Sequence, residues 1–279
     1  MSETIDQTLS GVAETLLIPL YNRAMESQRP DAIMKDEKAV ALVSQMSYDF
    51  DQVRKIRMSE GNKIARIMLT REMDRYARNF LNRHPKVVVV HIGCGLDSRF
   101  ERVDNGRLEW FDLDLPDVIG LRRKFIGDDR ERYHLLSCSV LDDAWLEMVK
   151  VHSQHPFLFL AENVFVYFME TQVKSLVLKL RDNFPGAELV FDGWTPFFVW
   201  LGNLQLSSSK FAGLLHWGFW SSQTIEDWGE GITMLSQWGF FDQPETRMDP
   251  YRCMAPFFRL FKPMRIFHFQ LGNSSEGKD

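Results

Sequence analysis

The sequence predicts an α/β protein with a doubly wound, Rossmann-like, mostly parallel sheet. Three observations predict it: five short apolar runs of strand length, helix start signals between them, and a continuous β-branched run at residues 86–92. A strand without polar alternation is typical of a sheet covered by helices on both faces. Alternating strands and helices indicate crossover connections, which place ligands at the carboxyl ends of the strands.

The first 82 residues are expected to form a helical cap. Asp36 can accept the N-terminal hydrogen bond of a helix whose apolar positions recur at helical spacing up to Met46. A second helix is expected after Gly61, with Ile64, Ile67 and Met68 on one face.

Residues 83–193 are expected to form the α/β core. Its strands are predicted at residues 86–92, 108–113, 133–140, 157–161 and 187–191. Pro116 favours a helix start, Asp142 or Asp143 can cap the next helix, and Thr171 can cap the one through Leu180.

The last third breaks this alternation because it is rich in aromatic residues. Six of the eight tryptophans lie between Trp194 and Trp238. We expect residues 194–262 to form a helical insertion, with core packing and a lid over the substrate as equally favoured roles. Residues 263–271 alternate like a closing strand, so the whole chain, 1–279, is interpreted as one domain.

Composition restricts the class of protein. The net charge of −5 and pI of about 5.8 argue against a protein that binds nucleic acid by neutralising phosphates. Three cysteines without paired spacing indicate neither a disulfide framework nor a zinc site, and no metal is expected. The start has no signal-peptide pattern and the apolar runs are too short to span a bilayer. We therefore expect a cytoplasmic protein with a small-molecule partner and no membrane or nucleic-acid partner; the oligomeric state is not predicted.

The strongest chemical signal is the turn after the first strand, which contains Gly93 and Gly95. Glycines allow a ligand to approach the backbone closely, and we expect the turn to present free N–H groups. About 20 residues later, Asp112 and Asp114 are placed to bind ribose hydroxyls. A dinucleotide site would have a third glycine where Ser98 stands, so the pattern favours S-adenosylmethionine over NAD. The alternative is a glycine pair that only makes a tight turn.

Residues 91–99, His-Ile-Gly-Cys-Gly-Leu-Asp-Ser-Arg, and residues 111–116, Phe-Asp-Leu-Asp-Leu-Pro, carry a wider resemblance. Together they resemble the O-methyltransferase family of leucine carboxyl methyltransferase and of bacterial polyketide biosynthesis. Residues 159–168 are similar to a strand and turn of that family. Residues 29–33 and 35–39 are similar to its N-terminal segment, and residues 70–74 also match. The resemblance implies the class I methyltransferase fold and S-adenosyl-L-methionine as cofactor.

The same resemblance implies a role for each matching position. The glycine turn would pass under the methionine part of the cofactor, Asp112 or Asp114 would bind its ribose, and Arg71 its carboxylate. Glu162 would line the pocket near the ammonium group or the reacting centre. Ser139 stands where relatives often have an aspartate for the adenine amino group, and Asn163 replaces a glycine. The implied cofactor-binding residues are Arg71, Gly93, Cys94, Gly95, Asp112, Asp114, Ser139, Val140 and Glu162.

Residue types alone give alternative interpretations of these positions. Arg71 on a helix surface is most often a solvated charge. Glu162 ends an apolar strand, where a buried carboxylate needs a cationic partner. Asp192, which ends the next strand, is similar but can also cap the following segment.

The function predicted is O-methylation of a small, fairly apolar molecule by direct in-line transfer, with carboxyl slightly favoured over hydroxyl. A carboxylate acceptor is ionised near neutral pH and needs orientation, for which Tyr21, Arg23 and Arg29 are candidates. A hydroxyl acceptor would use a base, and His216 and His268 are the plausible ones. The predicted catalytic residues are Glu162, His216, Tyr21 and Arg23. A nicotinamide-dependent oxidoreductase and a non-catalytic cofactor-binding relative remain alternatives.

Overall fold

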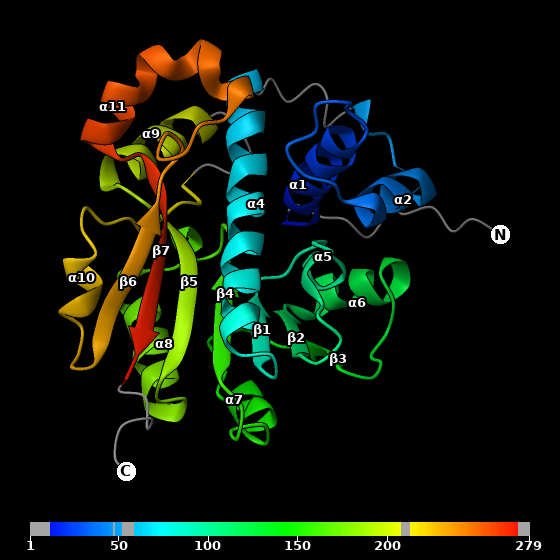
Figure 1. Ribbon diagram of the computed structural model, residues 1–279, viewed down its shortest axis with the longest axis vertical. Helices are drawn as coiled ribbons and strands as arrows, with labels where there is room; N and C mark the ends of the chain where they lie inside the picture. Colours follow the sequence, from blue (N-terminus) through cyan, green and yellow to red (C-terminus); the bar gives the residue numbers. More distant parts are fainter. Residues whose placement is uncertain (1–11, 47, 52–58, 208–212, 273–279) are drawn as a thin grey trace.

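The computed structural model describes residues 12–46, 48–51, 59–207 and 213–272. Seven strands form one sheet in the order β3-β2-β1-β4-β5-β7-β6 (Figure 1). The neighbours from β3 to β5 pair in parallel, and β7 pairs antiparallel with both β5 and β6. The expected doubly wound, mostly parallel α/β fold is confirmed.

The parallel strands overlap the five predicted apolar runs. They are β1 (Val88–Ile92), β2 (Glu109–Asp114), β3 (Tyr133–Ser137), β4 (Phe157–Ala161) and β5 (Ala187–Trp194). Every residue of β1 and β4 is buried. Helices on both faces of the sheet remove these side chains from water, which explains the absence of polar alternation.

Two helical layers enclose the sheet (Figure 1). One face packs against α4 (Glu60–Arg83), α5 (Arg99–Val103) and α6 (Pro116–Phe125). The other face packs against α7 (Ala144–Lys150) and α8 (Glu170–Asn183). The predicted starts at Pro116 and Asp143 are confirmed, whereas α8 begins one residue before Thr171, which lies inside the helix.

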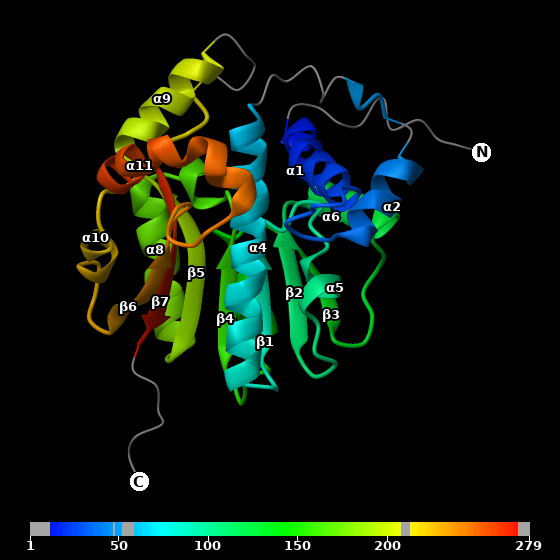
Figure 2. The same cartoon turned by 45° about the horizontal axis from the view of Figure 1, so that its top comes forward.

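The cap contains α1 (Val12–Ser27) and α2 (Glu37–Gln45), which lie over the carboxyl ends of β1 to β3 (Figure 2). Their apolar cluster includes Leu96 of the turn after β1 and Ile126 after α6. The predicted role of Asp36 as the N-cap residue of α2 is confirmed, since its side chain accepts the Ala39 N–H at 2.9 Å. Residues 1–11 of the expected cap lie outside the described residues.

The expectation that residues 194–262 are helical throughout is wrong. The segment contains α9 (Pro196–Leu206), α10 (Gln223–Glu226), the 3-10 helix η3 (Thr246–Met254) and α11 (Ala255–Phe261), but also β6 (Ile232–Trp238). This strand pairs with β7 (Met264–Leu271), the predicted closing strand. It alternates in burial along its length because it forms the sheet edge, and the surrounding aromatic residues obscured that pattern. Residues 208–212 lie outside the described part.

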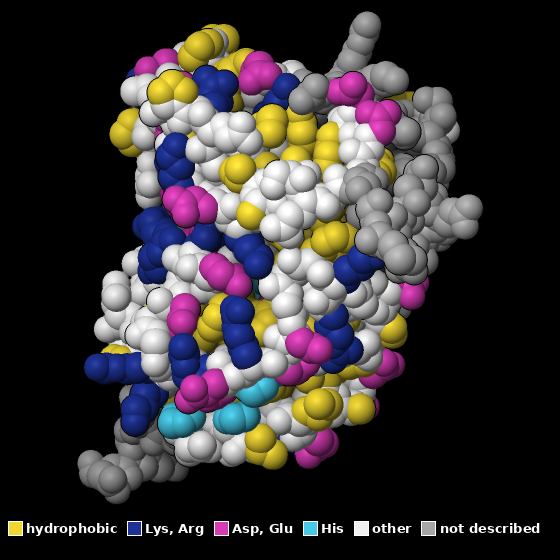
Figure 3. All heavy atoms as spheres, turned by 90° about the vertical axis from the view of Figure 1, so that its right-hand side faces the viewer, with side chains coloured by type: hydrophobic (Ala, Val, Ile, Leu, Met, Phe, Trp, Pro, Cys, Tyr) yellow, Lys and Arg dark blue, Asp and Glu magenta, His cyan; other side chains and the backbone are white. Residues whose placement is uncertain are grey.

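The charged surface is mixed on the face drawn in Figure 3, where Lys and Arg side chains alternate with Asp and Glu. Surface ion pairs of the described residues include Arg130–Glu101 at 2.9 Å and Arg132–Asp104 at 2.8 Å. None of the helices in the described residues combines the length and apolarity that a bilayer crossing requires.

Candidate cofactor and active site

The turn after β1 lies at the carboxyl edge of the sheet. Gly93 and Gly95 have φ values of +63° and +51°, in the left-handed region that glycine adopts without steric cost. A Cβ on Gly93 would overlap the side chain of Val164. The turn therefore requires glycine at this position.

The expectation of free N–H groups in this turn is wrong. The N–H groups of Gly93 and Cys94 donate to the Leu113 carbonyl of β2 at 2.8 and 3.3 Å. The Gly95 N–H donates to Asp114 Oδ2 at 2.8 Å. A ligand can approach the glycine backbone closely, but these three donors are already used.

Two buried arginines satisfy the carbonyl groups of the same turn. Arg122 of α6 donates to the Gly95 and Asp97 carbonyls at 2.7 and 2.9 Å. Arg23 of α1 donates to the Leu96 carbonyl at 2.8 Å. The turn is thus held in one shape from two directions before any ligand is bound.

Asp112 is a structural residue, and its expected ribose-binding role is wrong. Its side chain is 1% exposed and pairs with Arg122. It also accepts hydrogen bonds from Tyr133 Oη at 2.6 Å and Trp110 Nε1 at 2.8 Å. Burial alone would raise the pKa of Asp112, but the charge of Arg122 outweighs it and the pKa is lowered. No side of this carboxylate faces a ligand.

Asp114, at the end of β2, is the remaining candidate for binding the ribose hydroxyls. Its two oxygens accept the Gly95 and Leu115 N–H groups, both at 2.8 Å. Each oxygen keeps a lone pair for a further donor. Burial raises the pKa of Asp114, and the two backbone hydrogen bonds oppose that rise.

His91 connects the two halves of the polar network below the turn. Its Nε2 lies 2.9 Å from Arg99 Nη1, and its Nδ1 lies 3.2 Å from Asp112 Oδ1. Arginine can only donate, so Nε2 accepts and the proton is assigned to Nδ1. His91 thus joins Arg99 to Asp112 through its two ring nitrogens.

Glu162 follows β4 and forms the accessible end of the network. It pairs with Arg99 and accepts the Thr70 hydroxyl at 2.7 Å, while its side chain stays 13% exposed. The expected cationic partner is confirmed, and it is this chain's own Arg99.

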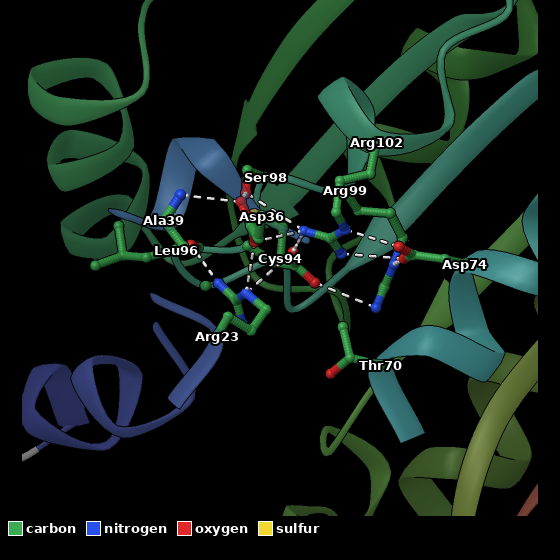
Figure 4. Close-up of polar contacts among 12 residues, drawn as sticks. Arg23, Asp36, Ala39, Thr70, Asp74, Cys94, Leu96, Ser98, Arg99 and Arg102 are labelled. Carbon is green, nitrogen blue, oxygen red and sulfur yellow. Dashed lines mark hydrogen bonds and ion pairs between the residues drawn. The ribbon is translucent and has the colours of Figure 1, made fainter. Parts of the chain in front are cut away.

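Behind Glu162, buried ion pairs join α1, α2, α4 and α5 (Figure 4). Arg102 bridges Asp74 at 2.7 Å and Asp97 at 2.8 Å. Burial would raise the pKa of Asp97, but the charges of three arginines hold it well below its usual range. The buried guanidinium groups are Arg23, Arg99 and Arg102, and the carboxylates are Asp36, Asp74, Asp97 and Glu162. Arg78 also pairs with Asp74, at 3.9 Å, but its side chain is 49% exposed and solvent screens its charge. Among the buried groups the carboxylates therefore outnumber the guanidinium groups by one, which favours a cation beside Glu162.

The structure does not place Arg71 with Glu162. Thr70 contacts Glu162, but the next residue on α4 faces another direction. Arg71 pairs with Glu245 at 2.8 Å and with Glu72 at 3.3 Å. Its expected pairing with a ligand carboxylate is therefore not supported in this conformation, because both partners already come from the protein.

Arg23 and Tyr21 are both buried in the helical cap, which does not support their expected catalytic role. Arg23 is 4% exposed and donates to Asp36 at 2.9 Å and to Leu96. Tyr21 is buried and stacks on Phe50 with ring centroids 5.3 Å apart. Both residues instead dock the cap on the core.

Ser139 and Val140 lie in the turn after β3. The Ser139 N–H donates to Asp142 Oδ2 at 3.1 Å, and the Val140 carbonyl accepts Trp145 Nε1 at 3.1 Å. Asp142 is exposed and supplies a carboxylate in the loop where Ser139 has none. The sequence identified Asp142 only as a helix cap.

Asn163 keeps the left-handed backbone that its position requires, with φ of +54°. Its N–H donates to buried Asp192, which also accepts Trp194 Nε1 at 3.2 Å. Burial raises the pKa of Asp192 to about 7, and the charge of Glu162 adds to the rise. Asp192 is thus a carboxyl group paired with backbone and indole donors, without a cation.

Of the two candidate bases, only His216 lies beside the site. It is exposed, and its N–H donates to the Val166 carbonyl at 2.8 Å, four residues after Glu162. His268 is buried against Glu188 at 2.6 Å, so it cannot serve as a base for a bound acceptor.

Sequence reasoning missed the buried arginine set as a unit. Arg99 and Arg102 are three residues apart and share one face of α5, which is a local signal. Their pairing with Asp74 on α4 depends on how distant helices pack, which no spacing reveals.

The matching family model is described as "Leucine carboxyl methyltransferase" and covers residues 17–180. A similar relative is the tetracenomycin polyketide synthesis O-methyltransferase TcmP of Streptomyces glaucescens, 33% identical over 250 residues and 88% of each chain. Another is the S-adenosyl-L-methionine-dependent methyltransferase dpfgK of Gibberella zeae. It is 33% identical over 201 residues, which are 66% of this chain and 67% of the relative.

Solved structures share the fold. A putative methyltransferase from Thermobifida fusca has a TM-score of 0.61 at 14% identity, with 96% of this chain and 97% of that chain covered. An S-adenosylmethionine-dependent methyltransferase from Mesorhizobium loti has a TM-score of 0.50 at 14% identity, with 70% and 96% covered. Both likenesses concern the architecture alone.

Proposed function

The chain belongs to the leucine carboxyl methyltransferase family, and we propose that it methylates an oxygen atom of a small, fairly apolar acceptor, a carboxylate in preference to a hydroxyl. It is an S-adenosyl-L-methionine-dependent methyltransferase. That membership replaces the alternative of a nicotinamide-dependent oxidoreductase.

The residues at the carboxyl edge of the sheet fit this cofactor, which supplies a methyl group bonded to a cationic sulfur. The excess of buried carboxylates over buried guanidinium groups, which ends at Glu162, carries the proposal, because it matches a ligand bearing a sulfonium and an ammonium group. Glycine at position 93 leaves the close approach that a Cβ would block. Asp114 keeps lone pairs for ribose hydroxyls, and Asp142 lies in the loop proposed for the adenine amino group.

Arg66 supports a carboxylate acceptor. It lies on α4 one turn before Thr70, whose hydroxyl contacts Glu162. Among the described residues it has no carboxylate partner, although it is half-buried. Burial raises the pKa of Tyr167, and the charge of Arg66 opposes that rise, so the two groups interact. Arg66 would orient an anionic oxygen toward the methyl group, and holding reactants in line supplies much of the rate enhancement.

Two further features concern the chemical class of the methyl acceptor. The relative TcmP is named for polyketide synthesis, which supports an aromatic, polyketide-type acid as the acceptor. His216 beside Val166 supports the second candidate, a hydroxyl acceptor, because that group needs a base.

The test is methyl transfer from methyl-labelled S-adenosylmethionine to paired aromatic acids and phenols, followed by mass spectrometry. We expect labelled methyl esters from the acids. Arg66→Met should raise the acceptor KM by roughly tenfold or more, since a charge-assisted hydrogen bond is lost, with cofactor affinity unchanged.

Arg123→Met is the matched control, because Arg123 pairs with Asp128 on the exposed surface. Label found only in phenol ethers would overturn the carboxylate preference. Equal KM values for the Arg66 and Arg123 variants would remove Arg66 from the acceptor site.

A further inference from the structure

A cavity of about 100 Å³ lies at β5, β7 and β6, on the face of the sheet opposite α4. None of its lining residues belongs to the network at Glu162. Its polar lining consists of Thr195, Ser221, Ser222, Gln237, Lys262 and Arg265. Hydroxyl, amide and cationic groups line it, and no carboxylate does.

Strand register creates the space. Gly193 of β5 lies directly opposite Arg265 of β7, and Gln237 of β6 lies opposite Phe267. A Cβ on Gly193 would come within 2.5 Å of the Phe219 ring. The missing side chain at position 193 leaves room for the Phe219 and Phe267 rings, which line the cavity together with Arg265.

The two cations of the cavity are not neutralised by the protein. Within the described residues, neither Lys262 nor Arg265 has a carboxylate at ion-pair distance. Asp242 lines the adjoining cavity together with Arg265, but it accepts the Gly239 N–H at 2.7 Å and forms no ion pair there. Arg265 is partly buried, and the fully buried arginines of the described residues, Arg23, Arg99 and Arg122, each have a carboxylate partner.

Thr195 supplies an independent sign of a ligand. The residue is 4% exposed, and its hydroxyl oxygen has no hydrogen-bond partner in the described part of the chain. A buried hydroxyl without a partner costs free energy, so such groups usually have a ligand or water. Thr195 is also the N-cap of the 11-residue helix α9, whose N-terminus favours negative charge.

Lys262 occupies a backbone conformation that ordinarily selects glycine or asparagine. It ends α11 with φ of +43°. A side chain kept in the left-handed region at a helix end indicates that the side chain itself has a use.

We propose that this cavity binds a small oxyanion, a phosphate-type or carboxylate group, between Lys262, Arg265 and the Thr195 hydroxyl. Its volume equals that of roughly three water molecules, the size class of such a group. Two cations, a hydroxyl donor and a helix N-terminus favour an anion over a neutral ligand. The ligand is either a free anion or the anionic group of a larger molecule that enters past exposed Trp220.

The experiment is calorimetric titration of the full chain with inorganic phosphate and, separately, with acetate, at constant ionic strength set by sodium chloride. We expect saturable binding of at least one of the two anions. Stronger binding of phosphate identifies a tetrahedral anion, and stronger binding of acetate identifies a carboxylate group.

Three variants distinguish the cavity from general charge effects. Lys262→Asn removes the amine and tolerates the left-handed backbone, and Lys262→Arg keeps the charge. Arg259→Gln removes an exposed charge of α11 that does not line the cavity. Lys262→Asn should weaken binding by roughly tenfold, as expected for one charge-assisted hydrogen bond, and Lys262→Arg should restore most of it.

Arg265→Gln should abolish saturable binding, and its folding is checked by circular dichroism. Because Lys262 is exposed, its variants keep the proposal testable if the Arg265 variant fails to fold. No saturable binding of either anion to the unaltered protein would overturn the proposal. So would equal losses in the Lys262→Asn and Arg259→Gln variants.

Discussion

At the scale of single residues, Asp112 and Asp114 differ in their position along β2. They share one side of β2, but Asp112 lies under the sheet's helical layer and Asp114 lies at the strand end. Asp112 pairs with Arg122, whereas Asp114 accepts two backbone N–H groups. Two aspartates two positions apart therefore have separate tasks.

Replacing aspartate by asparagine should therefore affect folding stability at position 112 and cofactor binding at position 114. Asp112→Asn should lower the free energy of unfolding by about 3–5 kcal/mol, because it leaves the buried Arg122 charge without its partner. Asp114→Asn should leave stability within about 1 kcal/mol and weaken S-adenosylhomocysteine binding. Urea unfolding and calorimetry measure the two quantities; a cofactor affinity unchanged in Asp114→Asn would remove Asp114 from the ribose site.

At the scale of elements, Asp36 holds the helical cap on the core. It caps α2, pairs with Arg23 of α1 at 2.9 Å, and accepts the Ser98 hydroxyl at 2.6 Å and Arg102 at 2.8 Å. One carboxylate thus joins two cap helices to the segment after the glycine turn. Docking of the cap and the shape of the cofactor turn are coupled through it.

Asp36→Asn tests this coupling because asparagine is also a good N-cap residue, so α2 keeps its start. The lost charge leaves Asp97 as the one carboxylate that Arg23 and Arg102 still share among the described residues, and we expect faster hydrogen exchange in α1 and α2 than in β1 or β4. Glu37→Gln, at the exposed neighbouring position, is the control. Uniformly faster exchange across cap and sheet would contradict a specific role in docking.

At the scale of the whole molecule, buried carboxylates shape the pH dependence of stability in two directions. Asp74, Asp97 and Asp112 have pKa values lowered by arginines that outweigh burial, so their contribution is present above about pH 4 and lost in acid. The pKa of Asp192 is raised to about 7 by burial. Its folded state holds a proton that the unfolded chain has released, so this contribution is lost as the pH rises from about 4 to about 7.

Asp192→Asn isolates the contribution of Asp192 to the pH dependence of stability. Relative to the unaltered protein, the variant should gain stability as the pH rises from 4 to 7, by up to about 4 kcal/mol, since one pKa unit corresponds to about 1.4 kcal/mol. Urea unfolding across this range measures the difference. Asp182→Asn on the exposed face of α8 is the control, and a constant difference between wild type and Asp192→Asn would refute the raised pKa.

The elements predicted correctly are those whose signal is local. The β-branched run of β1 and the Asp36 cap of α2 depend on residues within a few positions of each other. The edge strand β6 was missed because its alternation lies within an aromatic segment. Its place depends on pairing with β7, about 30 residues later, which the local pattern does not contain.

The amino-acid sequence by itself determined the α/β fold, the family and the glycine turn, because the signal for each comes from residues that are close together in the chain. Only the tertiary structure decided that Asp112 is internal, that Arg99 is the partner of Glu162, and that Arg71 and Arg23 are already paired. The physical reason is that an ion pair depends on distance in space. Thr70 and Glu162 are 92 positions apart in the chain yet within hydrogen-bond distance, and no spacing in the sequence encodes that contact.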